Sequence, residues 1–127
     1  MSPADRFARL SELLAADADL RRRGRWVVVE CRVDIGHEPF FLTLRAGRLA
    51  EFTRGARLLR SIAFSIQGTD EAWRSHWQAV PAPGWHDLFA LTKRGAASIQ
   101  GDLRPLLQNL QYFKDLLALP RRLPEES

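Results

Sequence analysis

The side chains best suited to chemistry are three histidines, and none has the spacing of a catalytic or metal-binding motif. His37 falls in a turn sequence, whereas His76 and His86 belong to two separate expected helices. Two imidazoles chelate a metal from one helix only when they share a face, as in HxxH or HExxH spacing. His86 is next to Asp87, but neighbouring residues of a helix point in different directions. We therefore expect surface or capping roles for the histidines, and we predict neither catalytic residues nor a metal site.

Carboxylates and the single cysteine give no reacting pair either. Asp70 and Glu71 follow Thr69, which is typical of a helix cap and its acidic first turn, and Asp102 is likewise interpreted as a cap. Cys31 alternates with valines, which predicts a packed core thiol. The sequence contains no glycine-rich phosphate loop and no G-x-S-x-G elbow. These observations predict a protein that is not an enzyme and that needs no cofactor.

The unusual chemical feature of the chain is aromatic. It has four tryptophans, and Trp73, Trp77 and Trp85 lie close together on either side of the Pro/Gly stretch 81–84. Each tryptophan buries on the order of 150–250 Å², so the three together could line a large apolar surface. Two interpretations are open: ordinary core packing, or a pocket between two short helices and a sheet that holds a lipid-like ligand.

Apolar periodicity predicts the elements of the N-terminal half. Phe7, Leu10 and Leu14 form one stripe, which predicts a helix over 3–20. Residues 25–35 alternate strictly between apolar and polar, which predicts a long strand with one wet face and hence an antiparallel sheet. Further strands are expected over 40–45, 49–53 and 60–67. Ala46-Gly47 is the expected hairpin turn between the first two of them.

The C-terminal half is predicted to be mainly helical. Helices are expected over 69–94, interrupted at 81–84 because proline cannot continue a helix. A fifth strand is predicted over 96–100, a leucine-rich helix over 103–119, and a mobile tail over 120–127. Antiparallel strands followed by helices predict a single α+β domain spanning residues 1–127, with its helices on one face of the sheet.

Charge and composition restrict the compartment and the partners. The hydrophobic fraction of 46% favours a packed globular chain, and the net charge is +4. The one basic cluster, residues 21–25, is interpreted first as a solvated helix end and second as a transient contact with an anionic membrane surface. We do not expect nucleic acid as a partner. A lone thiol and the absence of signal-peptide and membrane-span patterns predict a cytoplasmic protein.

Two segments of the chain resemble sterol carrier protein type-2 domains. FSIQGTDEAW, residues 64–73, resembles the place where a strand of that family ends and an acidic helix start follows. ASIQGDL, residues 97–103, is similar to the family's short strand that ends in Gly-Asp before the last helix. The element order matches from about residue 5 to 119. The resemblance implies a five-stranded, mainly antiparallel sheet with helices packed on one face, enclosing a hydrophobic cavity for sterols, fatty acyl chains or other lipids.

These observations predict a non-catalytic protein that binds or transfers a hydrophobic ligand. The expected ligand contacts are apolar side chains of the sheet floor, the middle helices and the last helix: Phe64, Ile66, Trp77, Trp85, Phe89, Leu107, Leu110, Phe113 and Leu117. The alternative is an accessory protein whose apolar helices bind a partner enzyme of lipid or quinone metabolism, or a second copy of the chain. An internal void would favour the ligand, whereas a filled core beside an exposed apolar patch would favour the partner.

Overall fold

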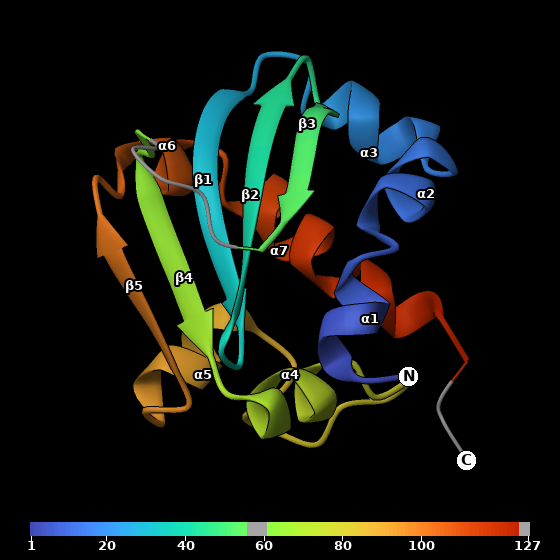
Figure 1. The fold of residues 1–127 in the computed structure, drawn as a ribbon, viewed down its shortest axis with the longest axis vertical. Coiled ribbons are helices and arrows are strands. Elements are labelled where there is room, and N and C mark those ends of the chain that lie inside the picture. Colours follow the sequence, from blue (N-terminus) through green and yellow to red (C-terminus); the bar gives the residue numbers. More distant parts are fainter. Residues whose placement is uncertain (56–60, 125–127) are drawn as a thin grey trace.

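The computed structural model describes residues 1–55 and 61–124. Along the chain, short helices come first, then four strands, two helices, a fifth strand and further helices (Figure 1). Their bounds are α1 Pro3–Phe7, α2 Leu10–Ala15, α3 Ala18–Arg23, β1 Val28–Ile35, β2 Glu38–Arg45, β3 Arg48–Arg54, β4 Phe64–Gly68, α4 Asp70–His76, α5 Leu88–Lys93, β5 Ala97–Gly101, α6 Arg104–Gln108, α7 Leu110–Ala118 and the 3₁₀ helix η1 Leu119–Arg122. The predicted α+β class is confirmed.

The five strands form one sheet in the order β3-β2-β1-β4-β5. Three neighbouring pairs are antiparallel, and only β1 and β4 run parallel among the described strands. After β3, at one edge of the sheet, the chain crosses to the far side of β1 and adds β4 there. A short hairpin can join only antiparallel neighbours, whereas a crossover of this kind allows β4 to run parallel to β1. The mainly antiparallel sheet is therefore confirmed. Residues 56–60, which include the expected start of the fourth strand, lie outside the described residues.

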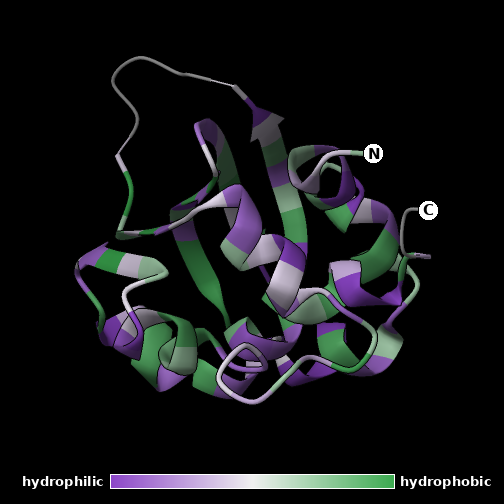
Figure 2. Cartoon of the chain, turned by 90° about the horizontal axis from the view of Figure 1, so that it is seen from below, coloured by the Kyte–Doolittle hydropathy of each residue, from purple (hydrophilic) through white to green (hydrophobic). Residues whose placement is uncertain are grey.

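Side-chain alternation gives the sheet one apolar face and one polar face. On β1, Cys31, Val33 and Ile35 are each 1% exposed, while Arg32 points to the opposite face. The helices α6 and α7 pass behind the sheet in Figure 1, and Figure 2 shows most helical turns on that side. The core lies between the two layers. Cys31 is a buried free cysteine, which confirms the predicted packed thiol, and its burial raises its pKa to about 12.

The hairpin between β2 and β3 follows the predicted turn chemistry. Ala46 has φ 53° and Gly47 has φ 75°, the two positive values that a tight two-residue turn requires. Thr69 caps α4 by accepting a hydrogen bond from the backbone N–H of Ala72 at 3.0 Å. Both local predictions are confirmed, because each depends on only a few neighbouring residues.

The helices are shorter than the periodicity predicted. Residues 3–20 form parts of three helices, and the third begins where Asp17 accepts a hydrogen bond from Leu20 N at 2.9 Å. The middle helix α5 begins at Leu88, not at Trp85, because the Asp87 side chain caps it. Residues 103–119 divide into α6 and α7, since the backbone of Asn109 leaves the helical region.

The chain beyond Pro120 continues to pack against the body of the protein. Leu119–Arg122 form η1, and Pro120 and Leu123 are buried. The guanidinium of Arg121 donates to the backbone carbonyl of His76 at 2.8 Å. The buried guanidinium of Arg6 donates to the Pro120 carbonyl at 3.0 Å. These contacts order the first part of the expected mobile tail, whereas residues 125–127 lie outside the described residues.

Candidate ligand-binding site

Four of the predicted ligand-binding residues meet where α7 covers the apolar face of the sheet. Phe64 and Ile66 project from β4, and Phe113 and Leu117 from α7, and each is at most 1% exposed. The rings of Phe64 and Phe113 pack edge to face, with centroids 5.4 Å apart at 81°. This geometry is favourable for aromatic pairs. The structure therefore brings the sheet floor and the last helix together, as predicted.

Trp77, a fifth predicted residue, joins this interface at the end of α4. Its indole N–H donates to the backbone carbonyl of Leu117 at 2.7 Å. Its ring stacks on Trp73 at 5.3 Å, and the Trp73 N–H donates to the Asp34 carbonyl at 3.0 Å. Both indoles are fully buried. Because each has its polar atom satisfied, both can remain in the core without a desolvation penalty.

Three phenylalanines extend the aromatic cluster, and sequence reasoning did not place them at the site. Phe7 of α1 stacks on Trp77 at 6.0 Å and meets Phe40 edge to face at 4.9 Å. Phe52 of β3 stacks on Phe40 at 5.5 Å. Phe7 and Phe40 occupied the apolar positions of predicted elements, but periodicity does not tell which strand a given helix covers.

The other predicted residues lie outside the closed interface: Trp85, Phe89 and Leu110 are partly exposed, and Leu107 is 54% exposed. The Arg94 guanidinium lies over the Trp85 ring at 4.1 Å. The Lys114 ammonium lies 5.4 Å from the Phe89 ring, which places α5 beside α7. We call these four side chains the partly apolar flank; they come from the loop before α5 and from α5, α6 and α7. Their role in ligand contact stays a prediction.

A small polar hollow separates the loop before α5 from α7. It has a volume of about 200 Å³, and His76, His86 and Arg121 contribute to its lining. Burial lowers the pKa of His76 to about 4, so its ring is neutral at pH 7. The Nδ1 atom lies 2.8 Å from the Trp85 carbonyl. Because a carbonyl only accepts, Nδ1 carries the proton, and Nε2 has no hydrogen-bond partner among the described residues.

Charged contacts hold this loop against α7. The Lys114 ammonium pairs with Asp87 at 3.0 Å. The Asp87 carboxylate also caps α5 by accepting from Phe89 N at 2.9 Å. One residue therefore ends the loop, begins α5 and binds α7. This arrangement positions α5 against α7.

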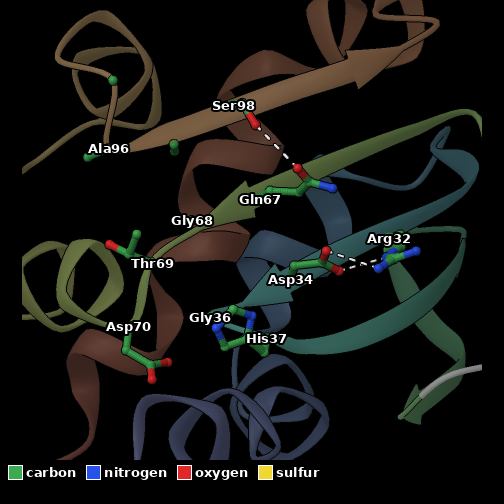
Figure 3. Close-up of a pocket in the computed structure, with 12 residues that line it drawn as sticks. Arg32, Asp34, Gly36, His37, Gln67, Gly68, Thr69, Asp70, Ala96 and Ser98 are labelled. Carbon is green, nitrogen blue, oxygen red and sulfur yellow. Dashed lines mark hydrogen bonds and ion pairs between the residues drawn. The ribbon is translucent and has the colours of Figure 1, made fainter.

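The opposite face of the sheet carries a larger hollow of about 580 Å³ (Figure 3). Arg32 and Asp34, two residues apart on β1, form a two-point ion pair at 2.7 and 3.0 Å in its lining. Gln67 of β4 accepts a weak hydrogen bond from Ser98 of β5 at 3.5 Å. Sequence reasoning described this side only as the wet face of the sheet. Its charged and amide groups suit polar ligands.

The side chains of Phe64, Ile66, Phe113 and Leu117 at this interface are each at most 1% exposed. The predicted internal cavity stays a prediction. Among the described residues, no helix is long and apolar enough to cross a membrane. In the same part of the chain, no group of three or more His, Cys, Asp or Glu side chains is arranged to hold a metal ion.

Comparison with solved structures identifies the fold. A crystal structure of sterol carrier protein 2 superposes with a TM-score of 0.71 at 13% identity, over 94% of this chain and 96% of that chain. A conserved hypothetical protein of Thermus thermophilus, described as possibly a sterol carrier protein, gives 0.61 at 14%, over 98% and 91%. A UbiJ-SCP2 ubiquinone synthesis protein gives 0.59 at 18%, over 96% and 93%.

The chain therefore has the sterol carrier protein 2 fold, which confirms the resemblance predicted from the two sequence segments. No family model and no curated protein matches the chain by sequence.

Proposed function

We propose that this protein binds a hydrophobic molecule, such as a sterol, a fatty acyl chain or another lipid, between α7 and the apolar face of the sheet. It holds or transfers this ligand without catalysis. The observation that carries the proposal is the composition of the interface. Phe64 and Ile66 below and Phe113 and Leu117 above present only apolar side chains to one another.

The contacts that attach α7 to the rest of the protein support the proposal that α7 is a movable cover over the apolar face of the sheet. On its buried side, Tyr112 donates a hydrogen bond to the Gly47 carbonyl, and the Leu117 carbonyl accepts one from Trp77. The ion pairs of α7 lie on its more exposed side. The helix begins after a break at Asn109 and ends in a 3₁₀ turn. Its contacts with the sheet floor are apolar, so a ligand that displaces α7 meets the same kind of surface that α7 covered.

Burial of apolar surface supplies the binding energy. A ten-carbon chain gains about 8 kcal/mol when its methylenes leave water. The cost of association and of displacing α7 is subtracted from that gain, so longer acyl chains and sterols, which bury more apolar surface, should bind more tightly than a ten-carbon chain. Phe89 and Leu110 on the partly apolar flank provide an apolar edge where the chain enters.

The proposal is tested by native mass spectrometry of freshly purified protein, organic extraction of bound molecules, and titration with a fluorescent fatty acid. A carboxylate at the entrance should repel an apolar chain, and Phe89→Asp should weaken binding about tenfold. Val80→Asp makes the same charge change on a side chain that is 89% exposed, and it should bind like the wild type. A clean apo mass without any binding of sterols or fatty acids would rule the proposal out.

A second candidate function is favoured by the 54% exposed side chain of Leu107. In this case the partly apolar flank buries a partner enzyme of lipid or quinone metabolism, or a second copy of the chain. Size-exclusion chromatography with light scattering and the same native spectra separate the two functions. A ligand-free dimer that Leu107→Ser converts to monomer would support association and not ligand binding.

A further inference from the structure

An exposed tryptophan lies at the end of the sheet where β1 begins. Trp26 is 80% exposed and Val28 is 73% exposed. They alternate with Val27 and Val29, which are buried in the core, so both point away from it. A single exposed apolar residue is ordinary. Two on the same face, one of them a tryptophan, make a local apolar surface.

Three arginines surround this apolar pair. In the sheet register, Val28 lies opposite Arg45 on β2, and Arg45 lies opposite Arg48 on β3. The Arg25 guanidinium lies 5.5 Å from the Trp26 ring. None of the three arginines forms an ion pair with a described residue. Like charges on opposite strand positions destabilise a sheet, so this surface concentrates positive charge at a cost to folding.

The neighbouring arginines of the basic cluster 21–25 have other roles. Arg21 donates to the Leu14 carbonyl at 2.7 Å. Arg22 pairs with Asp19 at 2.6 Å, and Arg23 pairs with Asp115 at 2.7 Å. The first three arginines of the cluster therefore stabilise the end of α3 and its contact with α7. Arg25 alone continues into the exposed surface.

The surface is held in a fixed shape. The hairpin turn between Arg45 and Arg48 packs against the end of α3, where a Cβ on Gly47 would lie 2.2 Å from the Arg21 carbonyl oxygen. The Tyr112 hydroxyl of α7 donates to the Gly47 carbonyl at 2.9 Å. The arginines are therefore displayed from a rigid platform that contacts the proposed ligand cover.

We propose that Arg25, Trp26, Val28, Arg45 and Arg48, the basic aromatic patch, dock on a membrane surface that contains anionic phospholipids. An indole is favoured at the level of the lipid headgroups, and guanidinium groups bind their phosphates. The exposed Val28 side chain gains from an acyl boundary, whereas nucleic acid offers it little. This choice of partner rests on the proposed function, because a protein that exchanges lipid must meet a membrane.

The test is co-sedimentation of the full chain with vesicles of phosphatidylcholine alone and of phosphatidylcholine mixed with phosphatidylglycerol. Wild type should sediment only with the mixed vesicles. Because each basic residue near such a surface contributes about 1 kcal/mol, Arg45→Gln with Arg48→Gln should lower the partition coefficient about 30-fold. Trp26→Ser should lower it as well. These side chains are exposed, and the paired arginines repel each other across the strands, so the variants should be at least as thermally stable as the wild type.

Matched controls lie on α4, α5 and the loop between them. Arg74→Gln with Lys93→Gln removes the same charge, and Val80→Ser removes an exposed apolar side chain. Both controls should sediment like the wild type. Equal losses in the controls and the patch variants, or equal sedimentation with neutral vesicles, would overturn the docking proposal. So would patch-dependent binding of a single-stranded oligonucleotide without any binding of vesicles.

Fluorescent fatty acid binding without vesicles separates this proposal from the proposed function. The patch variants should bind the fatty acid as the wild type does. If wild type binds no fatty acid but shows patch-dependent docking, the proposed function fails and the docking surface stands. If fatty acid binds and no vesicle does, the docking surface is wrong and the proposed function stands.

Discussion

The indole N–H of Trp77 donates a hydrogen bond to the backbone carbonyl of Leu117 across 2.7 Å and 40 residues of sequence. This contact ties the end of α4 to the last turn of α7, directly above the apolar face of the sheet. It is one of a few polar attachments of a helix that otherwise packs through apolar side chains. It should therefore influence both the stability of the protein and the movement of α7.

Trp77→Phe should lower the free energy of unfolding by about 2 kcal/mol, from one lost hydrogen bond and a smaller ring. Because the proposed ligand enters only when α7 moves away from the sheet, the variant should also bind fatty acid faster. The association rate should rise about fivefold for each kcal/mol by which the free energy of displacing α7 falls. Denaturant unfolding and stopped-flow fluorescence measure the two effects. Trp73→Phe removes a matching hydrogen bond to the Asp34 carbonyl at 3.0 Å. Since that bond does not involve α7, equal acceleration in this control would contradict the cover mechanism.

The edge-to-face pair of Phe64 and Phe113 should be energetically coupled. In a double-mutant cycle with leucine at each position, we expect a coupling free energy of about 0.5–1.5 kcal/mol from chemical denaturation. Phe40 lies in another part of the core and pairs with Phe7 and Phe52. A cycle that combines Phe40→Leu with Phe113→Leu should be additive. Additivity in the first cycle would show that the two rings do not form a specific contact.

The buried His76 should make stability depend on pH. Its pKa is about 4 in the folded protein and 6.5 in an exposed histidine, so the unfolded chain binds the extra proton between these values. Stability should therefore fall as pH drops from 6.5 towards 4, by up to about 1.4 kcal/mol per pH unit. His76→Asn keeps a donor for the Trp85 carbonyl but has no ring to protonate. On acidification, the free energy of unfolding of this variant should therefore fall by about 2 kcal/mol less than that of the wild type.

Unfolding free energies measured at pH 6.5 and 4.5 test this expectation. His86→Asn changes an exposed histidine and should keep the pH dependence of the wild type. If His76→Asn also keeps it, then the acid sensitivity comes from other groups and the buried neutral ring is not its cause.

The contact of Gly47 with α3 should make this position intolerant of a side chain. Gly47→Ala places a Cβ against the Arg21 carbonyl and forces alanine to φ 75°. Gly95 has a similar φ of 78° with no atom within 4 Å of its Cβ position, so Gly95→Ala measures the backbone strain alone. We expect Gly47→Ala to be more destabilising by at least about 1 kcal/mol. Equal melting temperatures would show that α3 yields to the new methyl group.

Features that depend on a few consecutive residues were predictable from the sequence. The alternation through Cys31 and Val33 determined the apolar face of β1, and Ala46-Gly47 determined a hairpin. Thr69 marked the start of α4. The segments on which the family resemblance rested contain such local signals, so the fold could be predicted although sequence identity to the superposed structures is low.

The candidate site was predictable only in part. Phe64 and Phe113 pack against each other because each lies on the apolar face of its own element, and their contact with a ligand stays a prediction. Leu107 has the same helical spacing as its neighbours, but it points into solvent because the helix breaks at Asn109. One change of backbone direction rotates all later positions relative to the earlier ones, and periodicity alone does not reveal it.

By itself the sequence determined the strands, the starts of α1, α4 and α6, and which side of each element is apolar, because these follow from the spacing of residues within a few turns or strand pairs. The tertiary structure alone decided that β4 runs parallel to β1, that Phe7 stacks on Trp77, and that the exposed Val28 lies opposite Arg45. Each of these depends on which distant segments come together. That choice is made by the packing of the whole core, to which every apolar side chain contributes at once.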